Sequence, residues 1–285
     1  MLVAVRFLVR LSAIALVFVA SAQAVSAAET RVRARYDLTL AGFNIGTASM
    51  QAGIQDQSYD LNVSARMTGL ARFLTGGRGA ATARGAVRDA TVAPAAYAIN
   101  TRSGEKGQVI RFALAAGAIR SMLVEPPART EGIVPVSDSD KRGVLDPVSA
   151  LMMPVAGAGD PLASSSCNRT LPVFDGRQRF DVTLRYDRTE TVKGASSAPG
   201  QYEGQAIVCK ASYKAISGHR PGRKQVAFME SNKDMEVWLA PVAGTRALLP
   251  WKISVRTEVG VAVIAASSFV VVRPGDKDKK VGADL

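Results

Sequence analysis

Short segments of strictly alternating apolar and polar residues are the most regular feature of the chain. In the second of them, Tyr59, Leu61 and Val63 alternate with polar residues, so that one side of an extended chain is apolar and the other is polar. This period-2 pattern predicts strands that are buried on one face. The segments that show it are 35–40, 59–67, 179–186, 207–216 and 251–259.

Clusters rich in glycine and proline separate these segments. Short strands with turns between them favour antiparallel pairing. We therefore predict a mainly β fold: an antiparallel, strongly curved sheet or a partly open β-barrel, with one or two short helices. The predicted turns lie at 42–46, 103–107, 175–176, 218–222 and 241–244, and loops are expected at 158–166 and 194–200.

Two short stretches are the candidate helices. One is 69–74, and the other follows Asp146, whose side chain can cap a first turn. Pro147 suits the first helical position, and Pro154 would end the helix. The pattern of strands continues unchanged through the chain, so we expect a single β-rich domain over residues 29–272.

The N-terminus has the pattern of an export signal. Arg6 and Arg10 lead into an apolar run at 11–20, and small residues follow it. The run has about ten residues, short of the ~20 that cross a bilayer. We predict a cleaved signal peptide over residues 1–28 and a soluble mature protein in the periplasm; a permanent N-terminal anchor is the alternative. The charged segment 273–285 is predicted to be a disordered tail.

The chain is strongly basic, with a formal net charge of +12. Outside the cytoplasm such a charge favours lipid or another anionic envelope component over nucleic acid, although a merely well-solvated surface is equally compatible. The protein partner stays unknown. The candidate anion- or partner-binding residues form two groups, of which the first is placed on one strand face by the alternation: Arg177, Arg179 and Arg185, then Arg220, Arg223 and Lys224.

Two cysteines, Cys167 and Cys209, are the only ones in the sequence. An oxidising compartment favours a disulfide between them, and the alternation in 207–216 directs Cys209 toward the core. Closing this loop stabilises the fold by roughly 4 kcal/mol in the chain-entropy description. A buried pair of thiols is the alternative, whereas the spacing lacks the C-x-x-C pattern of redox-active pairs.

No cofactor or metal motif is present in the sequence. His219 is the only histidine, in a basic turn where we expect it to be exposed, so triads and histidine metal sites lack their partners. Carboxylate pairs suit a glycan hydrolase acting on the cell wall, and the chain offers two of them. Aspartates in turns more often bond nearby backbone N–H groups, so we expect no catalysis from either pair. The pairs are Asp138 with Asp140, and Asp175 with Asp181.

Several short motifs, in a fixed order, resemble a bacterial exported family catalogued as domain of unknown function 3108. The resemblance implies a periplasmic, β-rich protein and carries over no catalytic residue. It extends from about Tyr36 to Val272. The motifs are 36–48 (YDLTLAGFNIGTA), 145–151 (LDPVSAL), 174–181 (FDGRQRFD), 249–253 (LPWKI) and 257–260 (TEVG).

The sequence thus favours a non-catalytic envelope protein whose curved sheet binds a lipid-like ligand or an envelope component. This hypothesis depends on the leader, the alternating strands and the basic charge, and by analogy on envelope carriers built from curved sheets. One alternative is a structural interaction module of an envelope complex. A carboxylate-dependent cell-wall glycan enzyme is the less favoured one.

Overall fold

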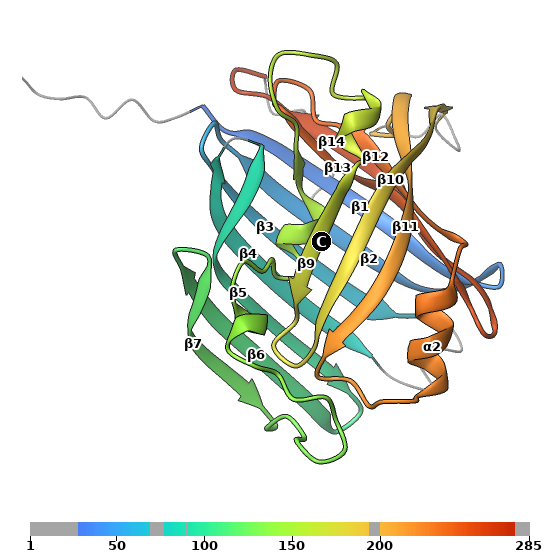
Figure 1. The fold of residues 1–285 in the computed structure, drawn as a ribbon. Helices are drawn as coiled ribbons and strands as arrows, with labels where there is room; N and C mark the ends of the chain where they lie inside the picture. The colour runs from blue at the N-terminus through green and yellow to red at the C-terminus, as the bar shows by residue number, and fades with distance from the viewer. Residues whose placement is uncertain (1–27, 69–76, 89, 194–199, 277–285) are drawn as a thin grey trace, which may run out of the picture.

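Antiparallel strands of one sheet make up almost the whole structure. The computed structural model describes residues 28–68, 77–88, 90–193 and 200–276. The sheet has fourteen strands, and Figure 1 shows how strongly it curves. They are β1 (Thr30–Leu40), β2 (Phe43–Ile54), β3 (Ser58–Met67), β4 (Arg78–Arg88), β5 (Thr91–Ser103), β6 (Lys106–Ala115), β7 (Ala118–Glu125), β8 (Met153–Pro154), β9 (Arg169–Phe174), β10 (Arg179–Val192), β11 (Gly204–Ser217), β12 (Met235–Pro241), β13 (Ala247–Thr257) and β14 (Gly260–Val272).

Two runs of hairpins are joined by the pairing of the first strand with the last. The order is β7-β6-β5-β4-β3-β2-β1-β14-β13-β12-β11-β10-β9, and β8 pairs with β13 beside this path. We call β1–β7 the N-terminal wing and β9–β14 the C-terminal wing. The outer strands β7 and β9 are edges of the sheet, so it does not close into a barrel. The predicted antiparallel, strongly curved sheet is confirmed.

The wings face each other across an apolar interior. Several residues predicted to face inward are buried, among them Tyr36, Tyr59, Leu61, Leu184 and Ile207. The prediction is wrong for Tyr186 and Val259, which are 41% and 70% exposed; Val259 lies in the turn after β13. The ring of Phe112 in β6 lies 6.0 Å from that of Phe174 in β9, centroid to centroid, so the two edges of the sheet approach each other. The two wings therefore share one core.

A segment between β7 and β9 lies inside the curve. Its apolar residues Val144, Val148 and Met152 are buried against the inward side chains of both wings. Asp146 is 0% exposed, and its carboxylate accepts N–H bonds from Val148 at 2.9 Å and Ser149 at 2.8 Å. The capping role predicted for Asp146 is therefore confirmed.

The predicted helix after Asp146 is wrong in extent. The chain forms only a 3₁₀ turn, Ser149–Leu151, and then enters β8, because Met153 and Pro154 pair with β13. Within the described residues the chain forms an α-helix at another place, α2 (Lys224–Ser231), which has no strong apolar stripe and was not predicted. The candidate helix at 69–74 lies outside the described residues.

The turn predicted at 42–46 is largely wrong. The chain turns at Ala41 and Gly42, and β2 already begins at Phe43. Gly46 is a strand residue: a Cβ there would lie 2.6 Å from the carbonyl oxygen of Arg66 in β3. The glycine thus permits close strand approach instead of marking a turn.

The predicted disulfide is confirmed. Cys167 and Cys209 are bonded and fully buried, and they pack with Leu184, Ile207 and Leu248 on the concave side of the C-terminal wing. Among the described residues, no helix is long and apolar enough to span a bilayer. The predicted leader, apart from its last residue, and residues 277–285 of the predicted tail lie outside the described part of the chain.

Removing the disulfide should lower the free energy of unfolding by roughly 4 kcal/mol, because the unfolded chain then loses a 42-residue cross-link. The variant is Cys167→Ala with Cys209→Ala, and urea unfolding followed by circular dichroism measures the loss. The oxidised and reduced wild-type protein form the matched comparison. A loss below about 1 kcal/mol would contradict the expected contribution.

Asp146 should make the fold more stable at mildly acidic pH. Burial raises the pKa of Asp146 to about 6, while hydrogen bonds from Ser149 and Val148 act in the opposite direction. The folded state therefore binds this proton more tightly than the unfolded chain, and stability falls as pH rises from about 4 to about 6, by about 3 kcal/mol.

Asp146→Asn keeps an acceptor for the two backbone N–H groups and removes the titration. Urea midpoints at pH values between about 4 and 7 should then show a flatter profile for this variant than for the wild type. Asp138→Asn, at an exposed carboxylate, is the control and should leave the profile unchanged. Parallel wild-type and Asp146→Asn profiles would rule out this role of Asp146.

Candidate functional site

A cavity of about 710 Å³ lies on the concave side of the N-terminal wing, where β3 and β5 end and β4 begins. Pro126 and Arg177 approach it from outside the wing. Its wall is mainly apolar and follows the inward side of the strands. The inward-facing residues that line it include Val63, Ala65, Met67, Ala81 and Ile99.

Small residues keep this cavity unfilled. Ala65, Gly79 and Ala81 occupy inward positions on adjacent strands, with Ala65 directly paired to Gly79. A Cβ at Gly79 would lie 2.9 Å from Cγ2 of Thr101, so even alanine there would crowd β5. The segment that contains Asp146 covers other inward residues and does not line this cavity. The volume therefore results from short side chains.

Arg177 reaches the cavity from a tight turn between β9 and β10. Oδ1 of Asp175 accepts the N–H groups of Arg177 and Gln178, each at 2.7 Å, which fixes the turn. Gly176 has φ of +97°, and a Cβ there would lie 2.4 Å from Cγ2 of Ile110 on the opposite wing. Only glycine lets the turn approach β6 this closely.

The guanidinium of Arg177 is incompletely satisfied. Nη2 donates to the carbonyl oxygen of Pro126 at 2.6 Å, whereas Nε is buried and has no hydrogen-bond partner within the described chain. Burial raises the pKa of the Asp175 carboxyl, and the N–H bonds of the turn oppose that shift. The site thus combines a mainly apolar cavity with the guanidinium of Arg177, and further basic residues border it: Arg66, Arg78, Arg102 and Lys106.

The first predicted basic group does not form one surface. Arg177 lies in the turn, because the strand begins only at Arg179, so its predicted place on a strand face is wrong. Arg179 forms an ion pair with Asp181 at 2.7 Å. Arg185 is exposed on β10, directly opposite Lys210 of β11. Of the three, only Arg177 contributes to the cavity.

The second predicted basic group gathers at a separate hollow of about 480 Å³. Arg220 and Arg223 line it together with Arg129 from the loop after β7. Lys224 is the first residue of α2 and does not line this hollow. His219, in the same turn, is half-buried, so its expected exposure is wrong.

Both predicted carboxylate pairs have structural contacts. Asp175 holds the turn described above, and Asp181 pairs with Arg179. Oδ2 of Asp140 accepts the N–H of Ser137, which lowers the pKa of Asp140. Within the described ranges, no group of three or more metal-ligating side chains comes together.

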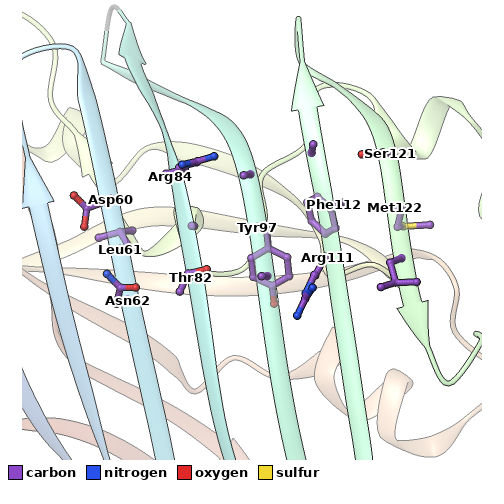
Figure 2. A pocket seen from close by; sticks show the side chains of 15 residues that line it. Asp60, Leu61, Asn62, Thr82, Arg84, Tyr97, Arg111, Phe112, Ser121 and Met122 are labelled. Carbon is purple, nitrogen blue, oxygen red and sulfur yellow. The ribbon is translucent and has the colours of Figure 1, made fainter.

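A shallow hollow of about 630 Å³ lies on the convex face, and sequence analysis did not single out its residues. Figure 2 shows Arg84 and Arg111 on the strands that flank β5. The outward residues of β5 between them are Ala96 and Ala98, so short side chains form the floor of the hollow. The alternation of residues in β4 and β6 could have indicated that these arginines point outward, but it does not identify a hollow.

The fold and the cavity define a β protein with an open, barrel-like sheet and a mainly apolar concave site. The chain belongs to the family described as "Protein of unknown function (DUF3108)", which matches residues 35–266. It is similar in fold to the beta-barrel-like protein of domain of unknown function DUF1849 from Brucella abortus. That crystal structure has 11% identity and a TM-score of 0.50, over 87% of this chain and all of the other. No curated protein matches the chain significantly.

Proposed function

We propose that this protein works in the bacterial periplasm and binds, without a catalytic step, an amphiphile that has an apolar chain and an anionic headgroup. The apolar chain would occupy the concave cavity, and Arg177 would contact the headgroup. The observation that carries the proposal is the coincidence of an apolar cavity with a guanidinium whose Nε is buried and unpartnered. The buried disulfide supports an oxidising compartment.

The energetics favour a charged oxygen at this position. A buried donor without a partner costs about 1–3 kcal/mol, and a carboxylate or phosphate oxygen would remove that cost. The cavity volume lies within the range of about 300–1,000 Å³ that is usual for small-molecule sites. A mainly apolar wall bordered by basic residues suits an acyl chain with an anionic headgroup.

A ligand should be retained by the protein purified from the periplasm. Native mass spectrometry and organic extraction are expected to find an amphiphile bound to the wild type. Ala65→Phe fills the cavity from β3 and should abolish retention. Ser64→Phe is the matched control, because Ser64 is exposed on the convex face of the same strand and does not line the cavity. A folded, ligand-free wild type would favour the alternative of a structural interaction module.

Arg177→Gln separates headgroup recognition from chain burial. We expect binding of a fluorescent long-chain fatty acid to weaken by about tenfold or more, because a charge-assisted hydrogen bond is lost. Binding of the methyl ester of the same fatty acid should change little. Equal effects on the acid and the ester would contradict the role proposed for Arg177.

A further inference from the structure

Two hairpins extend beyond their neighbours at one end of the sheet. β3 pairs with β2 only from Gly46 onward, and β12 pairs with β13 only as far as Val255. Beyond these points the β1–β2 and β13–β14 hairpins pair with each other, as Leu40 does with Ala262. We call residues 40–44 and 256–262 the hairpin tongue; Figure 1 shows the two hairpins side by side near α2.

The tip of the hairpin tongue is apolar and exposed. Phe43 is 77% exposed, Val259 70% and Val261 40%. The two turns touch, since a Cβ at Gly260 would lie 2.7 Å from Cβ of Ala41. Hairpin turns are normally formed by polar residues and glycine. Exposed apolar side chains on two adjacent turns therefore indicate a contact surface.

A row of three arginines crosses the convex face at the same end of the sheet. Arg66 is directly paired with Arg78, and Arg78 with Arg102. Like charges at directly opposed positions repel each other. Arg66 donates to Oγ1 of Thr47 at 3.3 Å and Arg102 to the carbonyl oxygen of Gly104 at 3.2 Å, but none of the three has an acidic partner within the described ranges.

We propose that the hairpin tongue and this arginine row dock the protein on an anionic lipid bilayer. The row meets β2 at Thr47, four residues after the strand's first residue, Phe43, so it lies about 13 Å from Phe43 along the strand. Apolar side chains of peripheral proteins enter the headgroup and acyl boundary by about 5–10 Å, which leaves long arginine side chains at the level of the phosphates. The phosphates would also relieve the repulsion within the row.

The charge of the surface favours a bilayer over an apolar protein partner. Guanidinium groups form bidentate bonds with phosphate oxygens, and a flat anionic surface can satisfy all three arginines at once. Glu258 is an exposed acid beside the tip and opposes this attraction. The docking does not require a ligand in the concave cavity, so it stands independently of the function proposed above.

Vesicle flotation tests the docking with the processed, disulfide-bonded protein. The protein should float with phosphatidylcholine vesicles that contain phosphatidylglycerol, and binding should fall with added salt. Replacing Arg66, Arg78 and Arg102 by glutamine should weaken binding on the order of a hundredfold, at the usual contribution of each basic residue near an anionic surface. The matched control replaces Arg33, Arg84 and Arg88, which lie farther from the tongue on the same face.

Variants at the tip separate insertion from charge attraction. Phe43→Ser should weaken vesicle binding by about tenfold, whereas Glu258→Gln should strengthen it. Phe43→Trp should add fluorescence that brominated acyl chains quench. Circular dichroism confirms that each variant is folded.

Three results would overturn the docking: equal losses for the two arginine triplets, unchanged binding of Phe43→Ser, or association with an envelope protein but not with vesicles. A wild type that binds vesicles but retains no amphiphile would leave the docking intact and contradict only the proposed cavity function.

Discussion

Hydrogen bonds between a buried carboxylate, a serine and a tyrosine hold the interior of this protein together. Ser149 donates its hydroxyl to Asp146, and its Oγ lies 2.7 Å from the hydroxyl of Tyr59 on β3. Since the single serine proton goes to the carboxylate, Tyr59 donates to Ser149. An open, curved sheet exposes an apolar concave face unless something covers it, and these bonds fix the covering segment to the N-terminal wing.

The position of the cavity follows from that arrangement. Val144, Val148 and Met152 cover inward residues of both wings, and none of them lines the cavity between β3 and β5. There the inward positions carry alanine and glycine, so the strands themselves do not fill the space. The turn at Gly176 then brings Arg177 across from the other wing. The covering segment and the cavity thus occupy different parts of the interior.

Alternation predicted β1, β3, β10, β11 and β13, because burial on one side constrains every second residue, but it did not predict the other strands. Tyr59 and Cys209 both point inward as expected. The pairing of β1 with β14 and the covering role of the segment around Asp146 were not predictable, because they depend on contacts between residues far apart in sequence. Gly46 shows why a local sequence pattern can mislead. A glycine that lets two strands approach closely looks the same in the sequence as a glycine that forms a turn.

The candidate site was predictable only in part for the same reason. Charge singled out Arg177, but alternation placed it on a strand, whereas the Asp175 side chain holds it in a turn. Of the cavity wall, only the residues of β3 were predicted to face inward, and the sequence does not tell a filled inward position from an empty one. The like-charged row of Arg66, Arg78 and Arg102 becomes visible only through strand register.

The two features proposed to meet lipid differ in what they demand of the fold. A cation beside an apolar cavity requires a rigid turn, because an arginine free to leave for water would lose its selectivity for a charged headgroup. A docking surface requires only that apolar hairpin tips and cations lie at the same end of the sheet. Two hairpins that are longer than their neighbours are enough to place the apolar tips there. Loss of the Asp175 turn should therefore affect the cavity without moving the hairpin tongue, which is held by the β1–β14 pairing.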